Sequence, residues 1–227
     1  MTNVLAFTAS HHRPLYLRHC VIQLKAQSYT CSHGIYINAA TFQNQNDSTN
    51  YTGLLSDLVT DNIKISYGKQ QHQHWNHINA LQLFDLDQFD LFLKIDDDDL
   101  YRTDYVKHIV EDYLHYQWDF SGIPSTYLLQ KDQIKFIKSC FHKDKSEATN
   151  TQLDQAMPGT YCFSRKAIQT IIDVGQDYNW THMYEDAFWL KWICESKQLV
   201  CRLRDHQDYT YNMHGQNFCK SRFKTVD

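Results

Sequence analysis

The chain contains the stretch Asp90-Leu-Phe-Leu-Lys-Ile95, and four consecutive aspartates, Asp96 to Asp99, follow it directly. The apolar run predicts a short buried strand, and the aspartates mark its carboxyl end. Ligands of open α/β sheets bind outside the carboxyl ends of the strands. The four carboxylates therefore mark the place where we expect a ligand site.

Strand and helix signals alternate before and after this stretch. Strand–helix alternation predicts right-handed βαβ units and a mostly parallel sheet. The expected strands are Val4–Thr8, Gly34–Asn38 and Ile63–Tyr67, and the expected helices begin at Pro14 and lie near Leu54–Val59, His74–Phe84 and Val106–Tyr113.

The second half of the chain is less regular. Trp118–Gly122 and the segments around Tyr127 and Ile134–Ile137 are expected to form a smaller mixed sheet. Helices are expected from Ser164 and from Glu185, where apolar residues recur at helical spacing. The polar segment 139–157 is predicted to be a mobile loop that closes over a bound ligand. No repeat or linker is visible, so we expect one domain over residues 1–227.

Composition narrows the class of protein. The chain has 227 residues, 42% of them hydrophobic, which is enough for a sizeable core. Its net charge of -4 gives no basic excess, so we expect no nucleic-acid partner. No apolar run is long enough for a transmembrane helix, and the first residues lack a signal-peptide pattern. Seven cysteines without a CxxC pair favour a reducing compartment, so we expect a cytoplasmic protein.

The four aspartates favour a bound cation. Neighbouring carboxylates repel one another, and Mg²⁺ typically takes one or two carboxylates plus substrate phosphates. An extended backbone would place Asp96 and Asp98 on one side and Asp97 and Asp99 on the other. An EF-hand is excluded because Tyr101 stands where its loop requires glycine. The competing interpretation is a solvated acidic loop without a ligand.

Five segments of the chain carry motifs. Phe92–Asp98 contains K-x-D-D-D, Tyr184-Glu-Asp186 contains a Glu-Asp pair, and Pro158–Arg165 is a small-residue strand ending in Ser-Arg; the other two are Thr8–Pro14 and Met213-His-Gly215. Together they resemble the GT-A glycosyltransferases, especially the inverting β-1,3-galactosyltransferase and Fringe-like enzymes and related bacterial glycosyltransferases. In this resemblance Thr8–Pro14 is similar to the nucleotide-binding opening, and Met213-His-Gly215 is similar to a late metal-binding histidine.

The resemblance implies an α/β GT-A (Rossmann-like) fold, with a mostly parallel central sheet flanked by helices and a smaller mixed sheet in the C-terminal half. It implies a metal-dependent, inverting transfer of a sugar from a nucleoside diphosphate sugar, with a UDP-sugar as first choice, to a glycan hydroxyl. The implied cofactor is Mn²⁺ or Mg²⁺, and bacterial surface polysaccharide is the implied product. Residues 1–99 would bind the nucleotide sugar and 100–227 the carbohydrate acceptor, with peripheral association with membrane-bound glycan machinery as a further option.

The resemblance also implies catalytic and metal-binding roles. Asp186 would be the general base, and Glu185 would orient the site or the acceptor. Asp98 would be the direct metal ligand, Asp96 would contact the ribose or the metal shell, and His214 would be a late metal ligand. A single positioned carboxylate suffices for inversion, because a single displacement needs no covalent nucleophile.

The resemblance implies that a second set of residues binds the nucleotide-sugar donor. Thr8 and Arg13 would lie at the base and the diphosphate. Asn38 stands where the broader family often carries an aspartate that contacts the base, so the identity of the nucleotide stays open. Asp97 would bind the donor, and a metal-binding register of Asp97 with Asp99 remains an alternative.

Two rival functions stay open. A sugar-phosphate nucleotidyltransferase would also use an acidic metal site, but Thr8–Pro14 lacks the glycines of a phosphate loop. A catalytically inactive sugar- or metal-binding module of the same fold is the other. His72, His74 and His77 favour a structural role over a zinc site, since no cysteine is spaced to complete the ligands.

Aromatic residues in the C-terminal half are also divided between structural and binding roles. Trp189 and Trp192 are expected in the core, because Phe188 and Trp192 repeat at helical spacing. Trp180 and Tyr184 flank the Glu-Asp motif and are candidates for stacking on an acceptor sugar.

Overall fold

A computed structural model describes residues 1–11, 13–38, 51, 53–69, 72–130, 133–138, 153, 156–177, 185–196, 198–214 and 224–225. Trp180, Tyr184 and most of the predicted 139–157 loop lie outside the described residues.

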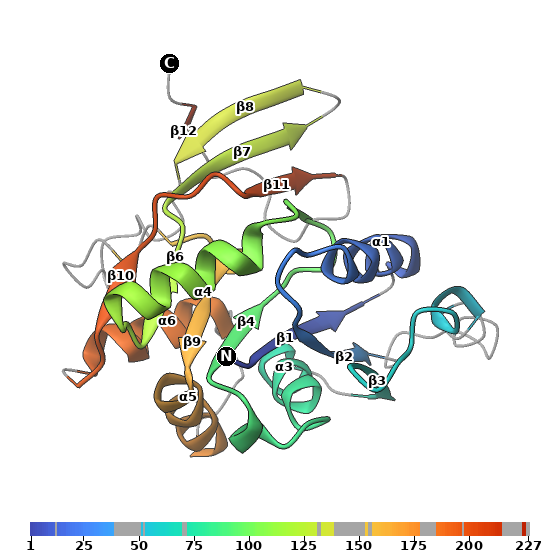
Figure 1. Cartoon of the computed structure of the whole chain (residues 1–227), viewed down its shortest axis with the longest axis horizontal. Helices are drawn as coiled ribbons and strands as arrows, with labels where there is room; N and C mark the ends of the chain where they lie inside the picture. Colours follow the sequence, from blue (N-terminus) through green and yellow to red (C-terminus); the bar gives the residue numbers. More distant parts are fainter. Residues whose placement is uncertain are drawn as a thin grey trace.

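A seven-stranded sheet forms the centre of the molecule (Figure 1). Neighbouring strands are parallel throughout, except that β9 runs antiparallel to both β4 and β6. The predicted mostly parallel sheet is therefore confirmed. In spatial order the strands are β10 (Cys201–Leu203), β6 (Phe120–Gly122), β9 (Cys162–Ser164), β4 (Leu91–Lys94), β1 (Val4–Ser10), β2 (Ser32–Asn38) and β3 (Ile63–Gly68).

The strand β6 corrects one sequence prediction. We expected Trp118–Gly122 in the smaller sheet, but β6 lies in the central sheet between β9 and β10. The physical reason is burial on both faces, because Phe120 joins one hydrophobic core and Trp118 joins the other, each with 0% exposure.

A second, mixed sheet lies at one end of the molecule (Figure 1). Its strand β11 is parallel to β7 and antiparallel to β5, so the predicted smaller mixed sheet is confirmed. Because β5 directly follows the four aspartates, its pairing with β11 brings a C-terminal segment back to the acidic cluster. In spatial order the strands are β12 (Lys224–Thr225), β8 (Gln133–Lys138), β7 (Ser125–Gln130), β11 (Tyr209–Met213) and β5 (Leu100–Tyr101).

Local sequence signals set the helix ends. Pro14 occupies the first turn of its helix, where a missing N–H costs nothing. The Ser164 hydroxyl accepts a hydrogen bond from the Ala167 N–H at 3.3 Å, so Ser164 caps the helix that was predicted to begin there. No helix among the described residues combines the length and apolarity needed to cross a bilayer. The helices are α1 (Pro14–Lys25), α3 (Gln73–Leu81), α4 (Tyr105–Tyr116), α5 (Arg165–Asp177) and α6 (Glu185–Glu195).

Helices cover both faces of the central sheet. On one face, side chains of α3, α5 and α6 pack with Phe7, Phe92 and Phe163. On the other face, α4 packs against Leu91 and Leu93, while α1 packs against β2. Trp189 lies in the first of these cores with 1% exposure, which confirms its predicted structural role.

Candidate active site

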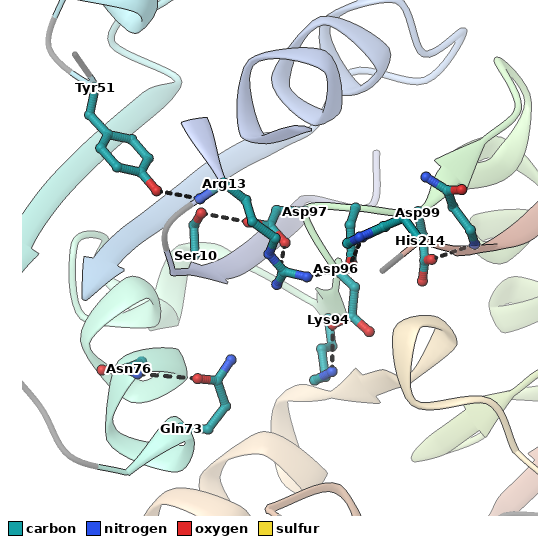
Figure 2. Close-up of polar contacts among 12 residues, drawn as sticks. Ser10, Arg13, Tyr51, Gln73, Asn76, Lys94, Asp96, Asp97, Asp99 and His214 are labelled. Atoms are coloured by element: carbon teal, nitrogen blue, oxygen red, sulfur yellow. Dashed lines mark hydrogen bonds and ion pairs between the residues drawn. The ribbon is translucent and has the colours of Figure 1, made fainter. Parts of the chain in front are cut away.

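Three parallel strands bring polar residues to the carboxyl edge of the central sheet. β1 ends at Ser10, β2 ends at Asn38 and β4 ends at Lys94. Because Phe7 pairs with Lys94, the residues after Lys94 lie beside the end of β1. The Ser10 hydroxyl accordingly donates to Asp97 Oδ2 at 2.5 Å (Figure 2). The expected ligand edge therefore carries the acidic cluster.

The backbone turns at Asp97 and Asp98 instead of continuing as a strand. The expected alternation of the four side chains is therefore wrong, because it required an extended backbone. Arg13 contacts both of the turn residues, with its Nη2 2.7 Å from Asp97 Oδ1 and its Nη1 bonded to Asp98 Oδ2. The backbone N–H of Arg13 donates to the Tyr51 hydroxyl at 2.7 Å, which fixes the start of α1 beside the cluster.

One arginine does not offset the charge of this cluster. Burial, and then the neighbouring Asp98, raise the pKa of Asp97 to about 7, although Arg13 acts in the opposite direction. Burial, followed by Asp98 and Asp96, raises the pKa of Asp99 well above its usual range. Buried carboxylates with raised pKa values gain from a bound cation, so the cluster suits a divalent metal ion.

The structure brings two of the three predicted metal ligands together. His214 Nε2 lies 2.9 Å from Asp98 Oδ2, and the His214 ring stacks on Tyr16 with centroids 4.5 Å apart. Asp96 is placed differently, since its Oδ1 accepts a hydrogen bond from Lys94 at 2.7 Å. Over the described residues, Asp96, Asp98 and His214 do not form a group whose ligand atoms all lie within 4.8 Å of one another.

Asp99 is held from the side of the small sheet. The Tyr209 hydroxyl donates to Asp99 Oδ2, and the Asn212 N–H donates to Asp99 Oδ1 at 3.0 Å. Gly159 leaves the space that these carboxylates need, because a Cβ there would lie 2.8 Å from Asp99 Oδ2 and 3.0 Å from Asp96 Oδ2. The predicted motif Pro158–Arg165 thus contributes a glycine that carboxylates approach closely.

Lys94 connects the acidic cluster to helix α6. The Lys94 side chain is 2% exposed, and its ammonium nitrogen lies 2.7 Å from Asp96 Oδ1 and 3.2 Å from Asp186 Oδ1. Burial opposes the charge on Lys94, but Asp186 and then Asp96 outweigh it and raise the pKa of Lys94 well above its usual value. Lys94 is therefore a permanent cation between the two carboxylates.

Glu185 and Asp186 begin α6 but meet different surroundings. Burial, and then the adjacent Asp186, raise the pKa of Glu185 to about 8, so Glu185 is largely protonated at neutral pH. Its Oε1 lies 4.0 Å from His77 Nδ1, and burial lowers the pKa of His77 well below its usual value. Asp186 instead faces Lys94, with its side chain 23% exposed. Such a pair of carboxyl groups in unlike environments is typical of acid–base sites.

The predicted base-binding residues lie on neighbouring strands. The Thr8 side chain is fully buried, and its hydroxyl lies 2.8 Å from His33 Nε2. Burial lowers the pKa of His33 to about 3, so this contact is between neutral groups. Asn38 lies at the carboxyl end of β2 with 7% exposure. Arg13 and Asn38 thus lie at the ligand edge, whereas Thr8 packs inside the sheet.

Sequence reasoning assigned no role to four residues of the site, although the first two stand inside segments that carry the resemblance: Ser10, Lys94, Tyr209 and Asn212. Only Lys94 carried a signal, since a charged residue inside the apolar run of a buried strand needs a partner. The contacts of the other three depend on how distant segments pack.

The histidines near residue 74 are structural. The Trp189 indole N–H donates to His74 Nδ1 at 3.0 Å, and the His77 ring lies against Trp189 with centroids 5.4 Å apart. Both histidines are almost fully buried and contact Trp189, which agrees with the predicted structural role.

No protein-family model and no curated protein sequence matches the chain. Among solved structures, it is similar to S. aureus TarS 1–349 in complex with UDP-GlcNAc, with a TM-score of 0.67 and 11% identity over 95% of this chain and 60% of that chain. The TarS 1–349 complex with UDP gives a TM-score of 0.62 and 13% identity, over 93% of this chain and 61% of that chain.

A second kind of structure matches less well. It is a 4-diphosphocytidyl-2C-methyl-D-erythritol synthase from Anaerococcus prevotii DSM 20548, with a TM-score of 0.52 and 12% identity, over 91% of this chain and 89% of that chain. The chain spans about 60% of the length of the TarS 1–349 structures. Together with the strand order described above, these comparisons show that the chain has the GT-A fold.

Proposed function

We propose that this protein is a metal-dependent, inverting glycosyltransferase that moves a sugar from a UDP-sugar to a glycan hydroxyl. The observation that carries the proposal is the chain of contacts from Asp96 through Lys94 to Asp186, at the edge of the sheet where Asp98 lies against His214. This arrangement supports the proposal, because the predicted metal-binding cluster and the predicted base share one lysine. The TarS complexes with UDP and UDP-GlcNAc support a nucleotide-sugar donor.

Asp98 and His214 would hold the metal ion. Their donor atoms already lie 2.9 Å apart. Asp96 would join them as a ligand if its carboxylate left Lys94 and turned toward the metal ion. Carboxylate ligands suit both Mn²⁺ and Mg²⁺, whereas the imidazole nitrogen favours the transition metal, so Mn²⁺ is the better match. When bound, such an ion neutralises the charge that develops on the leaving diphosphate. Arg13, beside Asp97 and Asp98, supplies a further positive charge at the same place.

Asp186 would act as the general base. The acceptor oxygen attacks the anomeric carbon, the bond from that carbon to the diphosphate oxygen breaks, and the hydroxyl proton goes to the Asp186 carboxylate. Lys94, 3.2 Å from Asp186 Oδ1, would orient the Asp186 carboxylate. Glu185 is largely protonated at neutral pH, so it is not the group that accepts the proton.

The remaining parts of the proposal follow the resemblance. Residues 1–99 would bind the donor and residues 100–227 the carbohydrate acceptor, in the synthesis of a bacterial surface polysaccharide. Peripheral association with membrane-bound glycan machinery would bring the enzyme to such an acceptor.

Thermal melting with UDP, GDP, CDP and ADP, each with Mn²⁺ or with a chelator, tests the donor site. A ligand at about 100 times its Kd adds roughly 2.7 kcal/mol to the stability of the folded state. In a chain of this size, that raises Tm by about 5–10 °C. We expect a shift with UDP that requires Mn²⁺. A shift with another nucleotide instead would mean that the donor sugar is attached to that nucleotide and not to UDP. No shift with any of the four would contradict the proposal.

A nucleotidyltransferase is the second candidate, because the synthase from Anaerococcus prevotii shares the fold. That activity would release pyrophosphate from a nucleoside triphosphate in the presence of a sugar phosphate or polyol phosphate. Incubation with CTP or UTP and such a phosphate, with detection of pyrophosphate, separates the two functions. We expect no pyrophosphate, and UDP release from a UDP-sugar instead.

A further inference from the structure

A second cluster of metal-ligating side chains lies apart from the acidic site, beside helix α4. It consists of His108 on α4 with His206 and Asp208, from the segment that joins β10 to β11. One ligand atom from each residue can be chosen so that all three lie within 4.8 Å of one another. In the part of the chain that the structure describes, this is the one such group of three.

The three side chains are already arranged around a common point. His108 Nδ1 lies 2.5 Å from Asp208 Oδ2, and the rings of His108 and His206 are stacked with centroids 5.3 Å apart. Zinc binds imidazole nitrogen at about 2.0–2.1 Å, so two ligands of one ion lie roughly 3–4 Å apart. Small side-chain rotations therefore bring the three donor atoms to that spacing.

The backbone on both sides of the cluster is fixed. His108 lies in the first turn of α4, with its N–H donating to the Asp104 carbonyl at 2.9 Å. The Asp208 carbonyl accepts from the Arg102 N–H at 2.8 Å, and the Arg204 N–H donates to the Gly122 carbonyl at 2.8 Å. The ligand-bearing segment is thus anchored to both sheets, which keeps its side chains close to α4.

A hollow of about 430 Å³ opens beside the cluster. Its lining includes the carboxylates Glu111, Asp112 and Asp205, against one cation, Arg202. Arg202 is already paired with Asp112 at 3.3 Å. The hollow therefore presents negative charge and room for solvent to a cation held by the three ligands.

We propose that His108, His206 and Asp208 bind a divalent transition-metal ion, with Zn²⁺ as the best match, at a site separate from the donor-metal site. Two imidazole nitrogens and one carboxylate oxygen form a ligand set that zinc takes readily, with water from the hollow in the fourth position. The ion ties α4 to the segment between the two sheets. Its ligand Asp208 precedes β11, the strand whose Tyr209 and Asn212 hold Asp99.

The test titrates Co²⁺ into the full chain carrying Asp98→Asn, which removes the proposed donor-metal ligand. Four-coordinate Co²⁺ absorbs visible light strongly, and we expect one equivalent to bind and Zn²⁺ to displace it. His206→Gln and Asp208→Asn, added singly to this background, are expected to weaken binding at least about 10-fold. His115→Gln is the matched control, because His115 lines the same hollow but lies roughly 10 Å along α4 from His108.

Melting curves provide the second readout. Zn²⁺ is expected to raise the Tm of the Asp98→Asn chain and of its His115→Gln derivative, but not that of the His206→Gln derivative. His206 is partly exposed, so its replacement is expected to leave the fold intact, and the melting curve without metal checks this. Three results would overturn the proposal: equal weakening by His115→Gln, sulfur charge-transfer bands that assign Co²⁺ to cysteine, or no saturable binding. The contact between His108 and Asp208 would then be a side-chain contact without a metal ion.

Discussion

The ammonium of Lys94 lies 3.2 Å from the Asp186 carboxylate, and this contact joins the end of strand β4 to the start of helix α6. Lys94 also contacts Asp96, so one buried cation serves both the acidic cluster and the proposed base. Lys94 therefore links the acidic cluster to the residue proposed as the base.

Replacing Lys94 tests this dependence. Lys94→Met leaves Asp96 and Asp186 without their shared cation, and breaking a buried ion pair costs about 3–5 kcal/mol. Since both carboxylates are partly exposed, we expect a loss of about 1–3 kcal/mol, a fall in Tm of roughly 2–10 °C. Lys107→Met is the control, because Lys107 and Glu111 form an exposed pair worth about 0.5 kcal/mol or less. Equal effects of the two substitutions would contradict the role of Lys94.

Asp186→Asn separates binding from chemistry. The amide has the size of the carboxylate but cannot accept the acceptor proton, so we expect transfer to fall by about 10²–10⁴-fold. Binding of UDP with Mn²⁺, measured by the melting shift, is expected to persist. Asp173→Asn on the exposed face of α5 should change neither quantity. Retained turnover in Asp186→Asn would remove Asp186 as the base.

The raised pKa of Glu185 predicts how stability depends on pH. Its pKa in the folded chain is about 8, against an ordinary value of 4.5, so the folded state holds a proton that the unfolded state releases between these values. The free energy of unfolding therefore falls as pH rises from about 4.5 to about 8, by at most about 1.4 kcal/mol per pH unit from this group. The raised pKa of Asp97 also lowers the free energy of unfolding as pH rises, up to about pH 7.

Denaturant unfolding in the presence of a chelator, repeated with Glu185→Gln, measures this effect. Glutamine resembles the protonated acid, so the decline between about pH 7 and pH 8, where Asp97 no longer contributes, should be smaller in the variant. The contribution of Asp99, whose pKa is also raised, is the same in both chains. Glu195→Gln at the exposed end of the same helix should retain the full decline. An unchanged slope in Glu185→Gln would show that Glu185 ionises at its ordinary pKa.

Gly159→Ala probes the space between the carboxylates. The added methyl would meet Asp99 Oδ2 at 2.8 Å and the Tyr209 hydroxyl oxygen at 2.7 Å, so one of these groups must move. We expect weaker Mn²⁺-dependent UDP binding by roughly 10-fold, as for other changes to residues that orient metal ligands. Gly53→Ala is the control, because nothing lies within 4 Å of the added Cβ. Unchanged binding by Gly159→Ala would show that Asp99 does not need its present position.

The metal-binding register is tested with Asp98→Asn and Asp99→Asn. Asp98 lies against His214, whereas Asp99 is taken up by Tyr209 and Asn212. We therefore expect Asp98→Asn to abolish most of the Mn²⁺-dependent UDP shift and Asp99→Asn to reduce it less. The opposite ranking would favour the Asp97 and Asp99 register.

The sequence determined the class of fold and the edge that carries the site. Both are encoded locally, because strand and helix periodicities span few residues and the aspartates directly follow an apolar strand. The Glu-Asp pair could also be placed at the start of a helix, because apolar residues at helical spacing follow it directly in the sequence. The sheet to which β6 belongs could not be predicted in this way. This strand has only three residues, and its place is set by pairing with β9 and β10, which are distant in the sequence.

Only the tertiary structure decided which charges meet. Asp98 contacts a histidine 116 residues away, and Lys94 at the end of β4 contacts Asp186 in helix α6. The turn at Asp97 and Asp98 also follows from packing, because Ser10 at the end of β1 and Arg13 just before α1 hold it. Contacts of this kind depend on the order and crossing of segments in space, which local propensities do not encode.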